Sequence, residues 1–570
     1  MVDVKEHISK KLRDILLEVK FEGVPEIKIS DSPQHGDYYT NLAMRLAKQA
    51  GKNPFEIAED IAAKFEKDEY VSKLEVVKPG FINFWVSEES LNGILDTVLK
   101  EKEKFGNSKK NSGKKAVVEF SSPNIAKPFT VGHLRSTIIG SAVASLLKAT
   151  GWEVFTDNHL GDWGTQFGKQ IYAIKTWGNE QDIEKADNPV KELVALYVKF
   201  HEEAEKNPEL EAEAREWFKK LENGDAEAKR LWQKCIDWSM IEFEKLYQKL
   251  GVKFSENGGK GYGESYFEDK MQPVLDELSK KALLKEDEGA KLVYFADDKF
   301  PPLMIVKQDG ATLYATRDLA TDKFRLEKHG SDVTIINEVG AEQSLYFQQL
   351  FEIENMLGWV KEGQRIHIRH GLYRFKEGKM STRKGNTVWL EDVLDEAEKR
   401  AESLVKEKSS GVDFEAIAIG ALKWNDLKRT PVQDIVFDWE DILNMQGNSG
   451  PYIQYTYVRT KSVFDKSGLL NISSNSVSHK LEKEEDELLR FLQFFPEVVL
   501  TSAETFTTSI VCNYLFELSQ RFNLFYQKHS ILEPKEGNEV RNFRLSLTFA
   551  VGQILKNGLT LLGIQTVEKM

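Results

Sequence analysis

The sequence predicts an α/β protein with a doubly wound parallel sheet, a small α+β domain before it and an all-α domain after it. Strand, helix and strand patterns follow one another twice in the middle of the chain, at 116–155 and at 333–369. That order places parallel strands side by side with helices between them. Helix and strand patterns are mixed in the first hundred residues, and helix patterns dominate from residue 412 to 570.

The length and composition are those of a multidomain globular protein. The chain has 570 residues, of which 41% are hydrophobic and 30% charged, and at roughly 100–200 residues per domain it has room for three or four domains. No apolar run reaches the roughly 18 residues of a membrane span, and the first residues lack the apolar core of a secretory signal. We therefore expect a cytoplasmic protein that does not contact a membrane.

The net charge of −13 counts mildly against a nucleic-acid partner, because such proteins usually present a positive face. Local basic tracks can still occur on an acidic enzyme. The two cysteines, Cys235 and Cys512, are far apart in the sequence and form neither a disulfide framework nor a CxxC zinc motif. We expect ordinary thiols in a reducing compartment and no zinc.

Residues 1–105 are predicted to form the α+β domain. Helical spacing of apolar residues occurs within 5–22, 41–50 and 54–65, and two strand patterns flank a Pro79-Gly80 turn. The polar, lysine-rich segment 101–115 marks the domain boundary. It is predicted to be either a solvated linker or a basic strap near RNA.

The parallel sheet is predicted within residues 106–411. Its first half comprises a strand at 116–120, a helix at 131–150 and a strand at 153–155, and the second half repeats the order at 333–336, 343–357 and 365–369. Doubly wound sheets bind ligands at the carboxyl ends of their strands. Between the halves, the charged segment of about 176–260 is predicted to be an inserted helical arm.

Residues 257–263, Asn-Gly-Gly-Lys-Gly-Tyr-Gly, superficially suggest a phosphate loop. They have no clear strand-to-helix context and lack the Lys-Ser/Thr ending of a P-loop, so we expect a flexible loop. In the all-α region 412–570, helices are expected at 414–427, 451–465, 484–495 and 542–561, with a loop at 466–478.

The first chemical motif is the string from Glu119 to Ser136, EFSSPNIAKPFTVGHLRS. It runs from the end of a strand through a proline-containing loop into a helix that starts near Val131. A helix N-terminus is a natural phosphate site, Gly132 permits close approach of a nucleotide, and His133 can donate to a phosphate oxygen. A Gly-His pair alone is equally typical of a turn with a surface histidine, but the complete string is far more specific.

The second motif is residues 376–386, KEGKMSTRKGN, after the last strand of the second half. Its cations and a serine hydroxyl can surround a triphosphate and stabilise the charge that builds on departing pyrophosphate. A basic loop alone is usually only surface. Pairing with the first string across a two-half sheet favours the functional interpretation.

These two strings resemble the His-x-Gly-His and Lys-Met-Ser-Lys signatures of class I aminoacyl-tRNA synthetases. The Lys-Met-Ser-Thr-Arg variant and the preceding Ser-Pro-Asn-x-Ala-Lys-Pro resemble the arginyl-tRNA synthetases in particular. The same holds for 159–168 (HLGDWGTQFG), 314–318 (YATRD) and 450–455 (GPYIQY). The resemblance covers about residues 100–570, and the first hundred residues match that family only in position and size.

The resemblance implies a Rossmann-like catalytic domain and an all-α anticodon-binding domain. It predicts these catalytic residues: Lys127, Thr130, Gly132, His133, Lys379, Met380, Ser381, Arg383 and Lys384. The predicted ATP contacts are Thr130, Gly132, His133, Lys379 and Ser381. Two positions depart from the family: Thr130 replaces the first histidine, and Thr382 replaces the second lysine. Lys127 can supply part of the phosphate contact that the first histidine would make. Arg383 or Lys384 can supply the positive charge that the second lysine would carry.

A guanidinium is planar, permanently charged and best held by a two-pronged carboxylate. Tyr314 and Asp318 stand four residues apart and share a face of a helix. Asp318 alone could equally be a helix cap or a surface ion pair. Glu119 on a buried strand would be costly unless paired, which hints at a cationic ligand. By the match to the family's arginine contacts, the resemblance implies an arginine site of Glu119, Ser122, Asn124, His133, Tyr314, Asp318 and Gln343.

The resemblance further implies the reaction and its partners. Arginine attacks the α-phosphate of ATP, and the 2′-hydroxyl of the terminal tRNA(Arg) adenosine then attacks the adenylate. Mg²⁺ is expected to accompany ATP, with no dedicated protein ligands, and activation is expected to need tRNA. We expect a monomer that does not bind DNA, with the N-terminal domain near the tRNA elbow. Tyr452, Tyr455 and Arg459 suit unstacked anticodon bases, although core packing explains these tyrosines equally well.

Three alternatives remain open. A cysteinyl or class I lysyl synthetase shares the signatures, but a cysteinyl enzyme needs a thiolate zinc site that two distant cysteines would not make. A pantetheine- or NMN-type nucleotidyltransferase shares the first signature but is small and lacks the helical domain. An RNA-binding paralogue with a disabled site is supported by Thr130 alone. One aminoacylation assay with bulk tRNA and twenty amino acids separates these possibilities.

Overall fold

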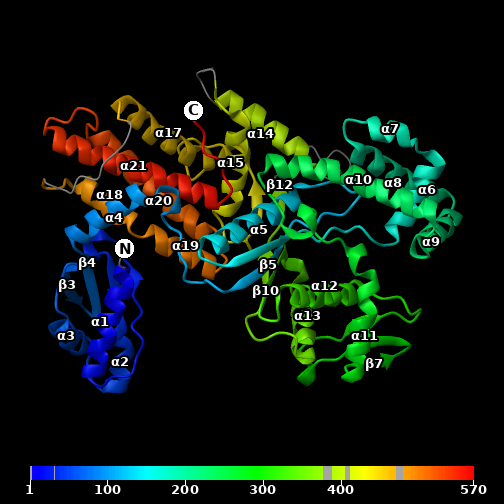
Figure 1. Cartoon of the computed structure of the whole chain (residues 1–570), viewed down its shortest axis with the longest axis horizontal. Coiled ribbons are helices and arrows are strands. Elements are labelled where there is room, and N and C mark those ends of the chain that lie inside the picture. Colours follow the sequence, from blue (N-terminus) through cyan, green and yellow to red (C-terminus); the bar gives the residue numbers. More distant parts are fainter. Residues whose placement is uncertain (1–2, 31, 376–387, 405–410, 470–478) are drawn as a thin grey trace.

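The computed structural model describes residues 3–30, 32–375, 388–404, 411–469 and 479–570. Figure 1 shows an elongated molecule with the N-terminal domain at one end, a helical arm at the other and a parallel sheet between them. The C-terminal helices lie beside the N-terminal domain. The predicted α/β, α+β and helical parts are confirmed as a fold class.

The central sheet has four parallel strands in the order β11-β10-β5-β6. They are β5 (Lys115–Glu119), β6 (Glu153–Asp157), β10 (Thr334–Gly340) and β11 (Arg365–His370). From β5 the chain crosses over to β6, its outer neighbour toward one edge of the sheet. From β10 it crosses over to β11, which lies toward the opposite edge. The crossover direction therefore reverses between β5 and β10, where Glu119 pairs with Asn337. A doubly wound sheet opens a ligand crevice at that point.

Helices cover both faces of this sheet. Side chains alternate across a strand, so Ala116 and Val118 of β5 join the core that contains α5 (Val131–Ala149). Val117 joins a separate core with Leu326 of α12 (Tyr314–His329). The helix between β10 and β11 is α13 (Ser344–Leu357). The two predicted β-α-β units are confirmed, each within a few residues.

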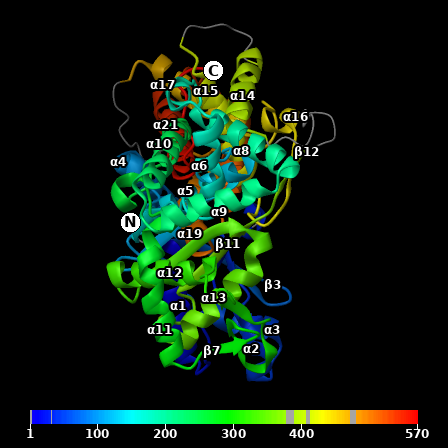
Figure 2. The same ribbon diagram turned by 90° about the vertical axis from the view of Figure 1, so that its right-hand side faces the viewer.

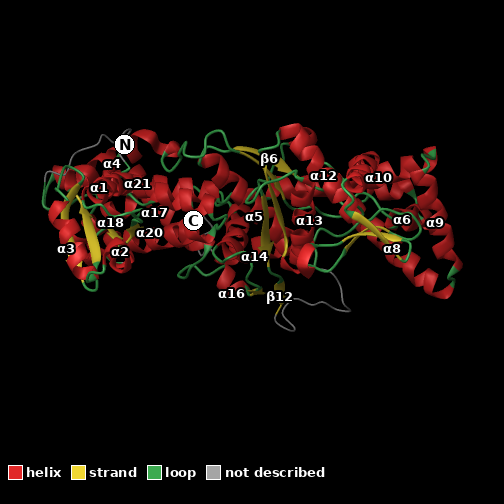
Figure 3. Ribbon diagram, turned by 90° about the horizontal axis from the view of Figure 1, so that it is seen from below, coloured by secondary structure: helices red, strands yellow, loops and turns green. Residues whose placement is uncertain are grey.

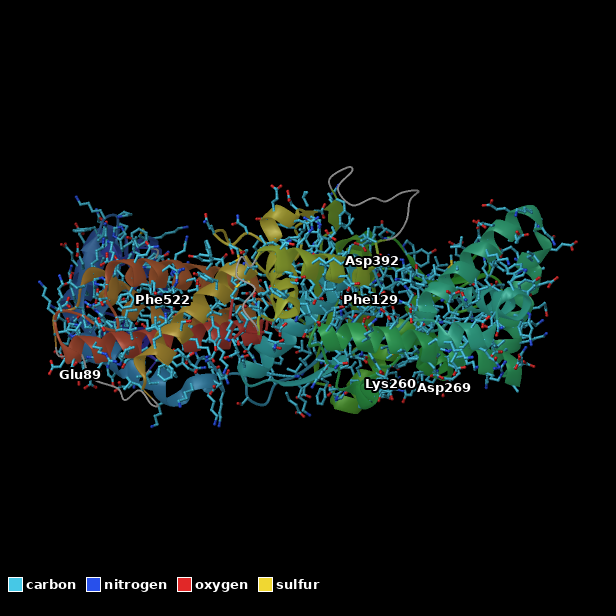
Figure 4. All side chains as sticks on the ribbon, turned by 90° about the horizontal axis from the view of Figure 1, so that it is seen from above. Glu89, Phe129, Lys260, Asp269, Asp392 and Phe522 are labelled. Carbon is cyan, nitrogen blue, oxygen red and sulfur yellow. The ribbon has the colours of Figure 1, made fainter. Side chains whose placement is uncertain are left out.

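The helical arm is longer than predicted at its start. It consists of α6 (Gln166–Trp177), α7 (Glu180–Lys185), α8 (Pro189–Lys206), α9 (Glu209–Glu222) and α10 (Ala226–Lys249). Figure 2 looks onto these helices. The last of them returns to the sheet, where Phe243 and Tyr247 contact the ring of Phe129. Figure 4 labels Phe129 near the middle of the molecule.

A small antiparallel sheet follows the arm and was missed at the sequence level. It comprises β7 (Leu284–Asp287), β8 (Ala290–Val293) and β9 (Leu303–Val306), with α11 (Met271–Lys280) packed in the same core. Its strands have four residues each, which is too short for a clear alternation. The glycine-rich segment 257–263, expected to be a flexible loop, begins within a 3-10 helix (Glu256–Gly259) and is packed. A Cβ on Gly261 would lie 2.3 Å from the Asn158 carbonyl oxygen.

The N-terminal domain is a four-stranded antiparallel sheet covered by helices, separate from the central sheet in Figure 3. Its strands are β1 (Lys28–Ile29), β2 (Tyr38–Thr40), β3 (Val71–Val77) and β4 (Phe81–Val86). Its helices are α1 (Val4–Glu18), α2 (Leu42–Ala50), α3 (Pro54–Lys64) and α4 (Glu88–Glu101). The predicted turn at Pro79-Gly80 joins β3 to β4.

The segment after α4 is not a solvated linker throughout, which corrects that interpretation. Phe105 is buried and stacks on Phe495, with ring centroids 6.1 Å apart. Asn557 donates hydrogen bonds to the carbonyl oxygens of Lys102 and Phe105. Phe105 is the single large apolar residue in a lysine-rich segment, and its partners lie 390 or more residues away, so no local pattern indicated this docking.

The C-terminal part is helical. It contains α14 (Leu390–Leu404), α15 (Phe414–Leu427), α16 (Trp439–Ile442), α17 (Gly450–Ser467), α18 (Lys483–Leu492), α19 (Phe495–Glu504), α20 (Ser509–Lys528) and α21 (Asn538–Leu561). Phe522 lies in its core (Figure 4). One short strand, β13 (Ile435–Phe437), pairs in parallel with β12 (Tyr373–Phe375). This pairing ties the helical part to the end of the α/β part.

Candidate functional site

A cavity of about 370 Å³ opens where β5 and β10 end. Glu119 ends β5, Asn337 and Val339 come from β10, and α12 and α13 close the sides. The predicted arginine residues that line it are Glu119, Ser122, Asn124, Tyr314, Asp318 and Gln343. The other lining residues include His159, Glu264, Asp322, Arg325 and Tyr346. Six of the seven predicted residues are thus gathered from three separate stretches of chain, and His133 is not among them.

A strained loop presents Ser122 and Asn124 to the cavity. Ser121 and Ser122 have φ angles of 75° and 46°, which are costly for residues other than glycine and concentrate at functional sites. Asn124 forms a β-bridge with Gly161, whose hypothetical Cβ would lie 2.3 Å from the Asn124 Oδ1. The Ser122 hydroxyl oxygen is buried and has no hydrogen-bond partner among the described residues. The loop therefore leaves a polar group available to a ligand.

Glu119 is paired within the chain, which corrects the inference that its burial points to a ligand. The Arg325 guanidinium lies 2.6 Å from the Glu119 Oε2 and 2.7 Å from the Asp157 Oδ2, and it also contacts Asp322 at 3.1 Å. Asn337 donates a further hydrogen bond to Glu119. Spacing in the sequence did not reveal Arg325, because it lies more than 200 residues from Glu119.

Asp318 faces the cavity from the second turn of α12. The Tyr346 hydroxyl donates a hydrogen bond to its Oδ2, and the Tyr346 ring packs against Tyr314 with centroids 5.5 Å apart. Burial raises the pKa of Asp318 to about 6, against the lowering effects of His159 and the Tyr346 hydrogen bond. Tyr314 itself is 60% exposed, so it lies at the rim of the cavity rather than inside it.

His159 and Glu264 add two further titratable groups. The His159 Nε2 lies 3.9 Å from the Asp318 Oδ1, and its Nδ1 lies 3.1 Å from the Tyr262 carbonyl oxygen. Burial raises the pKa of Glu264, partly opposed by Arg317. His159 belongs to the HLGDWGTQFG string, so the sequence contained a signal for it. Glu264 lies in an unremarkable segment and carried none.

The predicted nucleotide residues lie at the start of α5, outside this cavity. The Thr130 backbone N–H donates to the His133 Nδ1 at 2.9 Å, and the Thr130 hydroxyl lies 3.1 Å from the same nitrogen. Burial, with a smaller contribution from His370, lowers the pKa of His133 to about 4. Its ring is therefore neutral, with the proton on Nε2, which suits donation to a ligand oxygen. Lys127 is half-buried in the loop before Thr130.

The second string lies outside the described residues, so Lys379, Met380, Ser381, Arg383 and Lys384 have no structural account. The chain that follows it does reach the first string. Leu390 N–H donates to the Phe129 carbonyl oxygen at 2.9 Å, and Trp389 bridges to Thr130. The described residues that follow the second string are thus joined to the first string at the N-terminus of α5, and the cooperation of the two strings stays a prediction.

The three residues predicted to contact tRNA lie on α17. Tyr455 and Arg459 line a second cavity of about 490 Å³ with Tyr526 of α20. The Arg459 guanidinium carbon lies 4.9 Å from the ring centroids of both Tyr455 and Tyr526. Tyr452 points elsewhere: its hydroxyl accepts from Asn523, and its ring packs on Phe516. Tyr452 therefore has a packing role.

Cys235 and Cys512 are both free and buried. Burial raises the pKa of the Cys235 thiol to about 12. No group of three or more His, Cys, Asp or Glu side chains in the described residues is placed to hold a metal ion. Among the same residues, no helix has the length and hydropathy needed to cross a membrane.

Comparison with known proteins gives three family matches in chain order. The arginyl tRNA synthetase N-terminal domain matches residues 3–86, the catalytic domain of the class I (R) tRNA synthetases matches 94–439, and the DALR anticodon-binding domain matches 453–570. Together these matches cover nearly the whole chain.

Individual relatives align with this chain over their full length. Proteins named arginine–tRNA ligase from Clostridium perfringens and Halothermothrix orenii are 41% and 39% identical, and each alignment covers 100% of both chains. Solved arginyl-tRNA synthetases from Plasmodium falciparum and Thermus thermophilus share the fold, each with a TM-score of 0.82, at 24% and 22% identity. The first covers 100% of both chains, and the second covers 99% of this chain and 100% of the other.

Proposed function

Because this chain belongs to the arginyl-tRNA synthetase family, we propose that the cavity between β5 and β10 is where it binds the arginine side chain. The reaction is the ATP-dependent ligation of arginine to tRNA(Arg). The observation that carries the assignment of the cavity is that six residues predicted from sequence line it together. Its surplus of carboxylates suits one guanidinium.

We assign the arginine contacts by their positions. Asp318 accepts two N–H groups of the guanidinium, Tyr314 covers it from the rim, and Gln343 contacts it from the start of α13. Ser122 and Asn124 hold the α-amino group, since the free Ser122 hydroxyl and the Asn124 amide lie on the loop that leads to α5. The α-carboxylate then points toward α5, where the His133 Nε2–H can donate to it or to an ATP phosphate.

The first reaction step needs positioning and charge stabilisation rather than a protein nucleophile. The arginine carboxylate oxygen attacks the α-phosphorus of ATP, and the bond to pyrophosphate breaks. We propose that the N-terminus of α5, with Thr130, Gly132 and His133, holds the nucleotide. Lys379, Ser381, Arg383 and Lys384 stabilise the pyrophosphate, with Met380 in the same loop and Lys127 on the opposite side. In the second step a terminal ribose hydroxyl of tRNA attacks the adenylate carbonyl, the bond from that carbonyl to the phosphate oxygen breaks, and AMP leaves with the hydroxyl proton released.

We propose that the α17–α20 surface contacts the anticodon. Tyr455, Tyr526 and Arg459 line one cavity, and aromatic rings beside a guanidinium suit unstacked bases. Tyr452, the third predicted residue, packs on Phe516 and accepts a hydrogen bond from Asn523, and its contact with tRNA stays a prediction. The N-terminal domain is proposed to reach the tRNA elbow.

Four finer proposals complete the description. Mg²⁺ enters with the ATP phosphates and supplies charge neutralisation there, since the described residues offer it no ligand cluster of their own. The protein acts as a monomer, acts in the cytoplasm as part of translation, and needs tRNA to activate arginine. Pyrophosphate exchange with and without tRNA tests the last proposal, and equal rates would refute it.

The variant Asp318→Ala tests the arginine site. Losing the carboxylate partner of a buried guanidinium costs about 2–5 kcal/mol, so the arginine KM in pyrophosphate exchange should rise on the order of 10²-fold or more. The KM for ATP should change little. Asp309→Ala, an exposed acid shortly before α12, is the control. A wild-type arginine KM for Asp318→Ala would show that the cavity does not bind the arginine side chain.

A further inference from the structure

His159 is a buried ring in the proposed arginine cavity to which the mechanism above gives no role. Its Nδ1 faces the Tyr262 carbonyl oxygen at 3.1 Å. A carbonyl can only accept, so Nδ1 carries a proton in every state of the ring. Its Nε2 is buried and has no hydrogen-bond partner among the described residues. Titration of His159 therefore occurs at Nε2.

Charged groups face His159 from every element around it. Glu119 comes from β5, Glu264 from the segment before α11, Asp162 from the same loop as His159, and Asp318 and Arg325 from α12. Four of these are carboxylates and one is a guanidinium, while the Phe267 ring closes one side with centroids 5.7 Å apart. Burial alone would lower the pKa of His159, but Glu119 and Asp318 raise it above the usual value.

We propose that the His159 imidazolium is the counter-ion of Asp318 in the empty cavity, and that arginine binding displaces its Nε2 proton. This inference rests on the proposed binding of arginine beside Asp318. The ring nitrogen lies 3.9 Å from the Asp318 Oδ1, which is where a guanidinium would sit. Two cations at that distance from one carboxylate repel each other in a buried site.

The proton balance is simple. On binding, the Nε2–H bond breaks and the proton goes to solvent, leaving a neutral ring whose Nε2 lone pair accepts an N–H from the guanidinium. The cavity exchanges one cation for another, so its total charge is unchanged. Neutral ligands, such as citrulline, cannot make this exchange and leave the imidazolium in place. His159 is thus a proton-linked binding residue that adds to the selection of arginine.

Because arginine binding is coupled to the loss of the His159 proton, the direction in which arginine affinity changes with pH is determined. Below the pKa of His159 in the free enzyme, arginine must displace a proton, so its affinity rises by up to about tenfold per pH unit. Above that pKa the ring is already neutral and the rise ends. In His159→Gln the amide carries no titratable proton, so the corresponding rise should be absent and any remaining dependence should come from Asp318.

The experiment measures the His159 pKa directly in the full-length enzyme. Ring-labelled histidine NMR across pH 6–9, with the His159 resonance assigned by its loss in His159→Gln, should show the pKa falling by one unit or more at saturating arginine. Calorimetry in two buffers of different ionisation enthalpy should show that the wild type releases more protons than His159→Gln. His329→Gln is the matched control, because His329 faces Glu256 at 3.3 Å outside the cavity, and it should behave as wild type.

Two results would overturn the inference and are distinguishable. If arginine binds, Asp318→Ala abolishes binding and the His159 pKa does not move, the proton exchange is wrong while the proposed arginine site stands. If arginine binds with equal affinity to Asp318→Ala, the proposed site is wrong and the inference falls with it. If His159→Gln does not fold, calorimetry on the wild type remains decisive, because an absence of proton release on arginine binding would refute the exchange.

Discussion

At the scale of single residues, the cavity holds charges that oppose one another. Arg325 lies against Glu119, Asp157 and Asp322. Among the described residues, Asp318 has only His159, 3.9 Å away, as an ion-pair partner. Its raised pKa, about 6, records the cost of burying it in the empty cavity. A bound guanidinium removes that cost, so Asp318 is held ready for a permanently charged ligand.

The Tyr346 hydroxyl should control the pH range in which arginine binds. It donates to the Asp318 carboxylate and thereby favours the ionised form. In Tyr346→Phe the pKa of Asp318 should rise above 6, so a larger fraction is protonated at mildly acidic pH and cannot grip a guanidinium. The ratio of variant to wild-type arginine KM should be several-fold at pH 6.5 and approach one at pH 8.5.

Tyr294→Phe provides the matched control for this prediction. Tyr294 also donates to a carboxylate, that of Asp287 at 2.9 Å, but on the small antiparallel sheet away from the cavity. Its KM profile should overlay that of the wild type. A Tyr346→Phe ratio that is constant across the pH range would mean that the hydroxyl does not act through ionisation of Asp318.

At the scale of elements, a buried ion pair fixes α5 against α15. The Arg135 Nε lies 3.1 Å from the Asp426 Oδ2, and both side chains are at most 1% exposed. The remaining guanidinium donors reach the carbonyl oxygens of Pro431 and Gln433. Tyr373 of β12 donates to the same aspartate. The helix that carries the first signature is therefore held to the strand that leads into the second.

Replacing Asp426 by Asn should destabilise the protein strongly. Breaking a buried pair leaves an uncompensated charge and costs about 3–5 kcal/mol, which should appear as a lower unfolding midpoint in urea. Asp434→Asn is the control, because its partner Arg374 is 67% exposed and exposed pairs contribute about 0–1 kcal/mol. The double variant Arg135→Met/Asp426→Leu should recover part of the loss. Equal midpoints for Asp426→Asn and Asp434→Asn would contradict this account.

At the scale of the whole molecule, the sequence predicts well those elements and site residues that a local pattern of residues determines. The period of apolar residues located both β-α-β units and α15, motif strings located five residues of the cavity, and the family resemblance added Gln343. Contacts between distant segments were missed: Arg325 with Glu119, Phe105 with Phe495, and β13 with β12. Each joins partners from about 60 to 390 residues apart, and neither partner alone carries a pattern that names the other.

The docking of the N-terminal domain on the helical part gives a last prediction. Asp37 is buried in that domain, and its carboxylate is held by Arg490 of α18 at 2.9 Å and by the Gln493 amide at 3.1 Å. Burial raises the pKa of Asp37, and Arg490 opposes the rise. Arg490→Met removes the only cation that any described contact gives this carboxylate.

The variant should loosen the domain junction without touching the arginine cavity. A buried carboxylate without its partner costs about 3–5 kcal/mol, which favours release of the domain over continued contact. If that domain guides the tRNA elbow, the tRNA KM should rise several-fold and limited proteolysis near residues 87–110 should accelerate, while the arginine Kd stays unchanged. Arg13→Met, which loses the exposed pair with Glu6 and a hydrogen bond to the Ser9 carbonyl oxygen in the same helix, should alter none of these. An unchanged tRNA KM alongside faster proteolysis would mean that the domain is docked as described but does not guide tRNA.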